Sequence, residues 1–128
     1  MLTALVKDGW DMDVDRGPDW VLIRLRPTET EGTSDLSLAE KIWSLLEQSF
    51  TYRLVLELDC LELLRSPLIG QLVLLAKRIH SHGGMLRLCR LSAQNQQVLH
   101  VCRLDGCLPN YDSRGDAVMG ANRPLQPR

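Results

Sequence analysis

A single hydroxyl group is the strongest candidate for regulated chemistry in this sequence. Ser66 and Pro67 follow the apolar run Leu54–Leu58 and a short loop, and they precede apolar residues at helical spacing. A serine oxygen can accept a free backbone N–H at a helix start, and proline suits the next position because it has no N–H. We therefore expect Ser66 to be the N-cap of a helix. Its hydroxyl would lie at the positive end of the helix dipole, where a phosphate group is tolerated.

The other reactive side chains form no catalytic or metal-binding pattern. Asp11, Asp13 and Asp15 are spaced by two, which marks the solvent face of a strand, and the three histidines lack the spacing to share a metal ion. The sequence contains no glycine-rich phosphate loop, no nucleophile elbow and no carboxylate pair of recognised spacing. It therefore predicts no enzymatic activity, no metal and no cofactor.

Charge is unevenly distributed, although the formal net charge is only -1. No acidic residue lies between Glu62 and Asp105, and that segment contains Arg65, Lys77, Arg78, Arg87, Arg90 and Arg103. These cations either form one basic surface that attracts an acidic partner or phosphate groups, or belong to ordinary solvated faces, and the sequence leaves both open. The segment has no aromatic residue for base stacking, so a nucleic-acid partner is not expected.

The cysteines indicate a reducing environment. Cys60, Cys89, Cys102 and Cys107 form no C-x-x-C pair, and we expect four buried or half-buried thiols. There is no signal-peptide pattern and no apolar stretch long enough to span a membrane. The expected location is the cytoplasm.

The amino-terminal part predicts an antiparallel hairpin. Apolar and acidic residues alternate from residue 10 to residue 15, and Trp20–Arg26 is the expected returning strand. Pairing the two strands across the intervening turn places Met12 opposite Ile23. This register buries the apolar face of both strands.

The remaining pattern alternates helices with strands and predicts an α/β fold. Helices are expected from a capping box at Ser37 and Glu40, from Ser66, from Ser92, and from Asp112 or Ser113. Further strands are expected at Leu54–Leu58, Met85–Leu91 and Cys107–Tyr111. Trp43 lies off the apolar stripe of its helix, so it either covers a helix edge or belongs to a contact surface.

These elements predict one domain over residues 1–119 and a flexible tail over residues 120–128. The expected sheet is mixed and has four to five strands, with the amino-terminal hairpin followed by parallel crossovers and about four helices. The polar, acidic stretch 28–35 is expected to be a mobile loop.

The order of these elements and several short stretches resemble the STAS domain, the fold of bacterial anti-sigma factor antagonists. The resemblance covers residues 10–119 and keeps the order and spacing of every matching stretch. Those stretches are Leu54–Leu58, Leu63–Ser66, Gly70–Arg78, Gly83–Leu88, Leu104–Asp105 and Leu108–Ser113.

The family's switch motif is Asp-Ser-Ser-Gly-Leu, and a partner anti-sigma kinase phosphorylates its first serine. That serine corresponds to Ser66. Arg65 stands where the family has Asp, Pro67 replaces the second serine and Leu68 replaces glycine. Glu57 keeps the acidic character of the residue that ends the family's strand.

The resemblance implies a non-enzymatic regulatory domain that binds an anti-sigma factor, a serine kinase or another regulatory protein, and that phosphorylation at Ser66 switches. The alternative is a constitutive scaffold or accessory subunit with a degenerate switch motif that binds an anionic ligand at Arg65 and Ser66. The oligomeric state stays open. The residues expected to bind the partner are Glu57, Asp59, Arg65, Ser66, Pro67, Leu68, Gln71 and Leu74.

Overall fold

Six strands form one mixed sheet whose spatial order follows the chain, β1-β2-β3-β4-β5-β6. The computed structural model describes residues 2–7, 10–27 and 38–120, with side chains described in the last two ranges. β1, β2 and β3 are antiparallel neighbours, and β3 to β6 are parallel. The strands are β1 (Leu2–Lys7), β2 (Trp10–Arg16), β3 (Val21–Pro27), β4 (Arg53–Glu57), β5 (Met85–Cys89) and β6 (Asn110–Tyr111).

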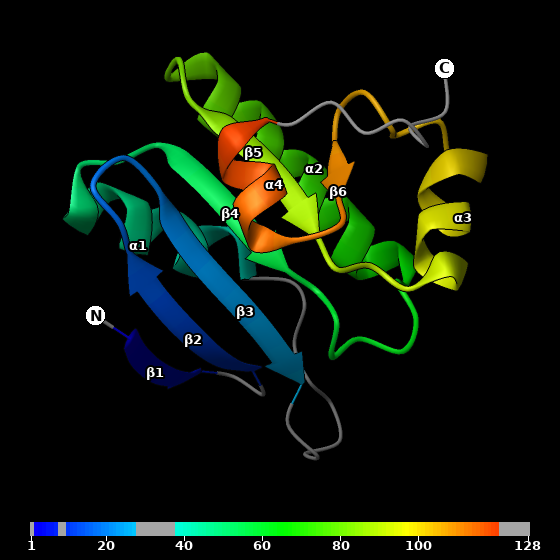
Figure 1. Cartoon of the computed structure of the whole chain (residues 1–128), viewed down its shortest axis with the longest axis horizontal. Helices are drawn as coiled ribbons and strands as arrows, with labels where there is room; N and C mark the ends of the chain where they lie inside the picture. The colour runs from blue at the N-terminus through cyan, green and yellow to red at the C-terminus, as the bar shows by residue number, and fades with distance from the viewer. Residues whose placement is uncertain (1, 8–9, 28–37, 121–128) are drawn as a thin grey trace.

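The described ranges contain four helices, placed on both faces of the sheet (Figure 1). α1 and α2 cover one face, α4 lies across the other face, and α3 lies beyond β6. The helices are α1 (Leu38–Ser49), α2 (Ser66–Ser81), α3 (Ala93–Val101) and α4 (Arg114–Met119). The predicted α/β class, the antiparallel start and the parallel crossovers are confirmed. None of the helices in these ranges is long and apolar enough to cross a membrane.

The sheet has one strand more than the four to five expected, because β1 pairs with β2 along its whole length. The hairpin of β2 and β3 forms as predicted, but its register is two residues away from the predicted one. Met12 lies opposite Leu25, and Ile23 lies opposite Val14. The turn begins one residue later than expected, at Gly17, whose N–H donates to the carbonyl of Trp20. A shift of two residues keeps the same side chains on the buried face, so the sequence pattern fits both registers.

Two hydrophobic cores occupy the two faces of the sheet. The larger lies between the sheet and α1 and α2, and it includes Leu54 and Leu56 of β4. The smaller lies under α4, where Val55 of β4 meets Cys89 and Ala117. β4 is therefore apolar along its length because both of its faces are covered.

Two helix starts form as predicted, and three predictions fall outside the described ranges. The Ser92 side chain accepts a hydrogen bond from the Asn95 N–H, and Ser113 does the same for the Asp116 N–H. Ser37, the loop at residues 28–35 and the tail from residue 121 lie outside the described residues.

The prediction of four buried or half-buried thiols is wrong for two cysteines. Cys89 is buried and Cys60 is half-buried, but Cys102 and Cys107 are exposed. Cys102 follows the last turn of α3, and Cys107 lies in the loop after it. Neither position is packed against the sheet or the other helices.

Trp43 is buried, at 2 % exposure, and does not form a contact surface. Its ring stacks on Tyr52 at a centroid distance of 5.3 Å and meets His82 edge-on at 4.7 Å. The guanidinium carbon of Arg78 lies 4.5 Å from the ring centroid. These three side chains cover the indole at the edge of α1.

Candidate functional site

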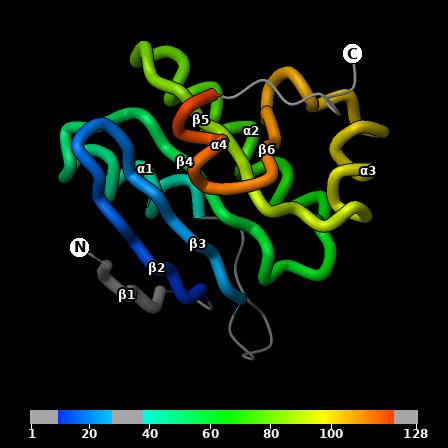
Figure 2. Tube along the Cα trace, viewed as in Figure 1, coloured from blue at the N-terminus to red at the C-terminus, as the bar shows by residue number. Residues whose placement is uncertain are grey.

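The loop between β4 and α2 leads to the predicted switch residue (Figure 2). The first hydrogen bond of α2 runs from the Ile69 N–H to the carbonyl of Arg65, at 2.9 Å. Arg65 is therefore the N-cap residue, and Ser66 is the first residue of the helix. The prediction that Ser66 is the N-cap is wrong by one position. The Arg65 side chain makes no capping hydrogen bond, because a guanidinium has no acceptor.

The start of α2 is exposed, and so are two leucines near it in the chain. Arg65, Ser66 and Pro67 are exposed. Leu74 is 57 % exposed, and Leu63, which the sequence analysis did not select, is 47 % exposed. The leucines of this loop have no periodic spacing, so nothing in the sequence distinguishes Leu63 from its buried neighbours.

Leu68 is buried at 3 % exposure in the larger core. Its predicted role as a contact for a partner is wrong, since the side chain faces the sheet rather than the surface. The position has helical spacing to Leu72 and Leu75, which share the same core. The helical spacing therefore predicts a core position for Leu68, and it is a stronger signal than the match to the family motif, which predicted contact with a partner.

Asn95 of α3 holds the loop and was not selected from the sequence. It is fully buried, and its side-chain oxygen accepts a hydrogen bond of 2.8 Å from the Leu64 N–H. Its side-chain nitrogen donates to the carbonyl of Leu61 at 3.2 Å. An asparagine in the first turn of a helix gives no sequence signal for this role. The two bonds fix the loop backbone directly before Ser66.

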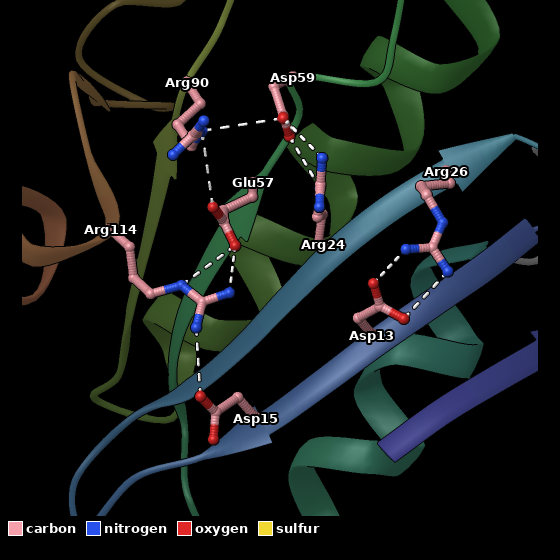
Figure 3. Close-up of polar contacts among 8 residues, drawn as sticks. All are labelled: Asp13, Asp15, Arg24, Arg26, Glu57, Asp59, Arg90 and Arg114. Carbon is pink, nitrogen blue, oxygen red and sulfur yellow. Dashed lines mark hydrogen bonds and ion pairs between the residues drawn. The ribbon is translucent and has the colours of Figure 1, made fainter. Parts of the chain in front are cut away.

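Charged side chains hold the other end of the loop (Figure 3). Arg24 of β3 donates two hydrogen bonds to the carboxylate of Asp59, at 3.2 and 2.9 Å. The Nε atom of Arg90 lies 3.8 Å from the same carboxylate. The Asp59 carboxylate therefore already pairs with two arginines of this chain, and these contacts fix the start of the loop.

Glu57 is buried and paired within the protein. It is 5 % exposed, and its Oε1 atom accepts hydrogen bonds from Nε of Arg114, at 3.1 Å, and from Nη2 of the same side chain. Arg90 lies 3.7 Å away on the other side of the carboxylate, and Arg114 also donates to Asp15 at 3.2 Å. Burial lowers the pKa of Arg114, but its hydrogen bond to Glu57 and the charges of Glu57 and Asp15 outweigh this and raise the pKa above its usual value.

These contacts give Glu57 a structural role that joins α4 to β4. Direct contact of its carboxylate with a partner, as predicted, does not fit the observed burial. The match to the acidic residue of the family motif could not distinguish a surface carboxylate from a buried one, because the pairing arginine lies 57 residues away in the chain.

Gln71 also has a partner inside the protein. Its side-chain oxygen accepts a hydrogen bond of 2.9 Å from the Ala39 N–H, in the first turn of α1. The side chain therefore satisfies one of the donors that a helix start leaves without an intrahelical partner. It is half-buried, so any contact with a partner protein would be at the margin of the site.

The basic segment of the sequence does not form one surface. Arg78 pairs with Glu40 on the helical face, and Arg90 lies beside Glu57 at the end of β4. Arg87 donates to the carbonyl of Ala117, on the face that α4 covers. Among the residues that the structure describes, no three His, Cys, Asp or Glu side chains are arranged to hold a metal ion.

Comparison with known proteins identifies the fold. No protein-family profile matches the sequence, and no curated protein matches it either. Solved structures do match. An anti-sigma factor antagonist from Mycobacterium paratuberculosis is 18% identical with a TM-score of 0.71, and the match covers 90% of this chain and 96% of that chain.

Two further structures agree with this result. An anti-sigma-factor antagonist (STAS) domain protein from Planctomyces limnophilus is 23% identical over 85% of this chain and 96% of that chain, with a TM-score of 0.69. The anti-sigma factor antagonist SpoIIAA is 16% identical over 88% of this chain and 99% of that chain, with a TM-score of 0.66, and is also known in a phosphorylated form. The chain has the STAS fold.

Proposed function

We propose that this chain is a non-enzymatic regulatory domain that binds an anti-sigma kinase or a related regulatory protein. The proposed contact region, the α2-start surface, consists of Leu63, Arg65, Ser66, Pro67 and Leu74. The observation that carries the proposal is the exposed Ser66 at the start of α2, with an exposed leucine before it in the loop and another about two turns further along the helix. A partner of this kind implies a cytoplasmic location and a role in transcription regulation.

The geometry of α2 supports one continuous contact region. Pro67 and Leu74 are seven residues apart, which is close to two helical turns, so both lie on the same helix face. Gly70 lies between them on that face, and a Cβ atom added there would meet no atom within 4 Å. A partner could therefore approach the α2 backbone closely at Gly70 and cover Leu74.

Phosphorylation of Ser66 is part of the proposal. A phosphate at the first position of α2 would meet the backbone N–H groups of the first turn and the positive end of the helix dipole. The exposed guanidinium of Arg65 is adjacent and can pair with the phosphate oxygens. The modification would replace a small neutral group by a dianion in the middle of the α2-start surface. We expect it to change partner affinity without unfolding the helix.

A second candidate is a constitutive interaction domain with the same contact region but no switch. Pro67 favours this function, because it removes one N–H donor that a phosphate could use and fixes the backbone beside the hydroxyl. Arg65 also stands where the family has an acidic residue. In this case Arg65 and Ser66 would bind an anionic group of the partner.

Affinity capture from the native host tests the proposal. The baits are the wild-type chain, Leu74→Glu, Ser66→Glu, and Val101→Glu as a control with an apolar side chain on α3 that is also exposed. Wild type and Val101→Glu should recover a kinase or regulator of the anti-sigma class. Leu74→Glu should recover at least about tenfold less, because a charge buried in the interface is costly.

The Ser66→Glu bait and phosphopeptide mapping separate the two candidates. Loss of the partner from Ser66→Glu, together with phosphate on Ser66 of protein from the host, supports the switch. Unchanged binding and an unmodified Ser66 support the constitutive domain. If Leu74→Glu binds as well as wild type, or if wild type recovers no such regulator, the proposal is wrong.

A further inference from the structure

A second group of side chains, four of them exposed and one (Arg87) half-buried, lies at the amino-terminal end of β4 and β5, the opposite end of β4 from the loop that leads to α2. We name it the basic edge, and it consists of Arg16, Phe50, Arg53, Met85 and Arg87. It takes its residues from the end of β2, the α1–β4 connection and the starts of β4 and β5. These segments meet at the same edge because β4 and β5 are parallel and begin side by side (Figure 1).

Strand pairing and side-chain contacts connect Arg53, Met85 and Arg87, and Arg16 contacts the residue before Phe50. Arg53 and Met85 are partners in the β4–β5 register, and Nη2 of Arg87 lies 3.5 Å from the sulfur of Met85. The guanidinium carbons of Arg53 and Arg87 lie 6.0 and 5.2 Å from the centre of the same Trp20 ring. Arg16 donates to the hydroxyl of Ser49, the residue next to Phe50, at 2.8 Å.

Within the described part of the chain, the three arginines of the basic edge have no carboxylate partner. Among the residues that the structure describes, no Asp or Glu oxygen lies within 4.0 Å of their guanidinium groups. Five other arginines differ in this respect, because each pairs with a carboxylate: Arg24, Arg26, Arg78, Arg90 and Arg114. The positive charge of these three side chains is therefore not balanced by a carboxylate of the described residues.

Phe50 has an unusual position for the only phenylalanine of the chain. Its side chain is 88 % exposed, and its φ angle of 52° lies in the left-handed region. That conformation costs a residue other than glycine about 1 kcal/mol, and glycine is the usual residue where a helix ends in this way. Because the phenyl ring is almost fully exposed, its packing within the chain offsets little of this conformational free energy.

We propose that the basic edge binds an acidic segment of another protein that carries at least one large apolar side chain. Carboxylates of the segment would pair with Arg53 and Arg87, and its apolar side chain would cover Phe50 and Met85. Nucleic acid is less suitable, because three cations neutralise few phosphates and the whole chain has a net charge of -1. The proposal does not depend on the α2-start surface, which lies at the other end of β4.

The test measures binding of a fluorescein-labelled synthetic peptide in which glutamate alternates with leucine to the full chain, by fluorescence anisotropy. We expect saturable binding that weakens as salt is raised. Arg53→Glu should weaken it at least about tenfold, since it replaces an attractive charge by a repulsive one. Phe50→Ala should weaken it about fivefold through the lost apolar contact. Both positions are exposed, so thermal unfolding should stay close to that of wild type.

Matched variants show whether the binding is local. Arg103→Glu makes the same charge change on an exposed loop beyond α3, and Leu74→Glu alters the α2-start surface. Both should bind the peptide within about twofold of wild type. Capture of a regulator by Leu74→Glu as efficiently as by wild type, with peptide binding to the basic edge as expected, would count only against the proposed function.

Four results would overturn the proposal. These are no saturable binding by wild type, equal binding by Arg53→Glu and wild type, equal binding when lysine replaces the glutamates of the peptide, and tighter binding of single-stranded RNA than of the acidic peptide. Backbone amide shifts in an NMR titration provide a second readout. Residues 49–53 and 85–87 should shift, and shifts confined to other segments would contradict the proposed location.

Discussion

At the scale of single residues, the loop before α2 depends on a side chain that is fully buried. Asn95 satisfies both a backbone donor and a backbone acceptor of the loop before Ser66. Loops are usually variable and mobile, and this one is fixed by a buried amide from a different element. The exposed hydroxyl of Ser66 is therefore presented on a defined backbone.

Replacing Asn95 should destabilise the protein and loosen the loop. Asn95→Ala leaves the Leu64 N–H and the Leu61 carbonyl without partners in a buried site, and we expect a loss of about 3 kcal/mol in the free energy of unfolding. Urea denaturation measures this loss, and hydrogen exchange of the Leu64 amide should become faster. Gln97→Ala is the control, since Gln97 is exposed on the same helix and its loss should change stability by less than about 0.5 kcal/mol. A loss below about 1 kcal/mol for Asn95→Ala would show that its two hydrogen bonds to the loop contribute little to stability.

At the scale of elements, α2 is fixed differently at its two ends. Its start is exposed, whereas its end turns sharply into β5 through Gly83, with a φ angle of 73°, and Gly84. The N–H of the next residue, Met85, donates to the carbonyl of Tyr52, and the pairing of β4 with β5 begins there. The end of α2 is therefore held close to the sheet where β4 and β5 begin, whereas the start of α2 is available for contact.

Two glycines of this region should respond in opposite directions to alanine. A Cβ atom at Gly84 would lie 1.9 Å from the backbone oxygen of Tyr52, so Gly84→Ala must displace the start of β5 and should cost about 3 kcal/mol. Gly70→Ala meets no atom within 4 Å and replaces a poor helix former, so it should stabilise the protein by about 0.7 kcal/mol. Thermal or urea unfolding of the two variants measures both effects. Similar stability of the two variants would contradict the close approach of Gly84 to Tyr52.

At the scale of the whole molecule, the smaller core under α4 couples stability to alkaline pH. Cys89 is buried there, and burial, followed by the charge of Glu57, raises the pKa of its thiol from 9.0 to about 12. In the unfolded chain the thiol ionises near its ordinary value, so between the two values the unfolded state holds fewer protons than the folded one. Stability from this group is complete below pH 9.0 and is lost as the pH rises toward about 12.

Comparison of wild type with Cys89→Ala isolates this effect. Between about pH 8 and about pH 10, the wild type should lose about 1 kcal/mol more unfolding free energy than the variant. Urea denaturation at both pH values measures the difference, and the variant controls for the ionisation of tyrosines and lysines. Equal losses would mean that the Cys89 thiol ionises at its ordinary pKa in the folded protein.

Features that depend on neighbours in the sequence could be predicted, and features that depend on distant residues could not. Apolar periodicity and capping residues gave the elements from β2 to α4, because these signals arise from neighbours within a few residues. The exposed Ser66 and Leu74 followed from the same helical spacing. The hairpin register did not, since a shift by two residues buries the same side chains. Leu63, with no periodic neighbours, carried no signal.

The sequence alone determined the α/β class, the order of elements and the position of a serine at the start of α2, because each depends on local spacing. Only the tertiary structure decided which polar side chains are used internally. Glu57 pairs with Arg114, Asn95 binds the loop before α2, and Gln71 binds the start of α1. Each of these hydrogen bonds joins residues more than thirty positions apart, so local spacing carries no signal for it. Burial and charge pairing depend on which distant elements meet, and that is fixed by packing of the whole chain.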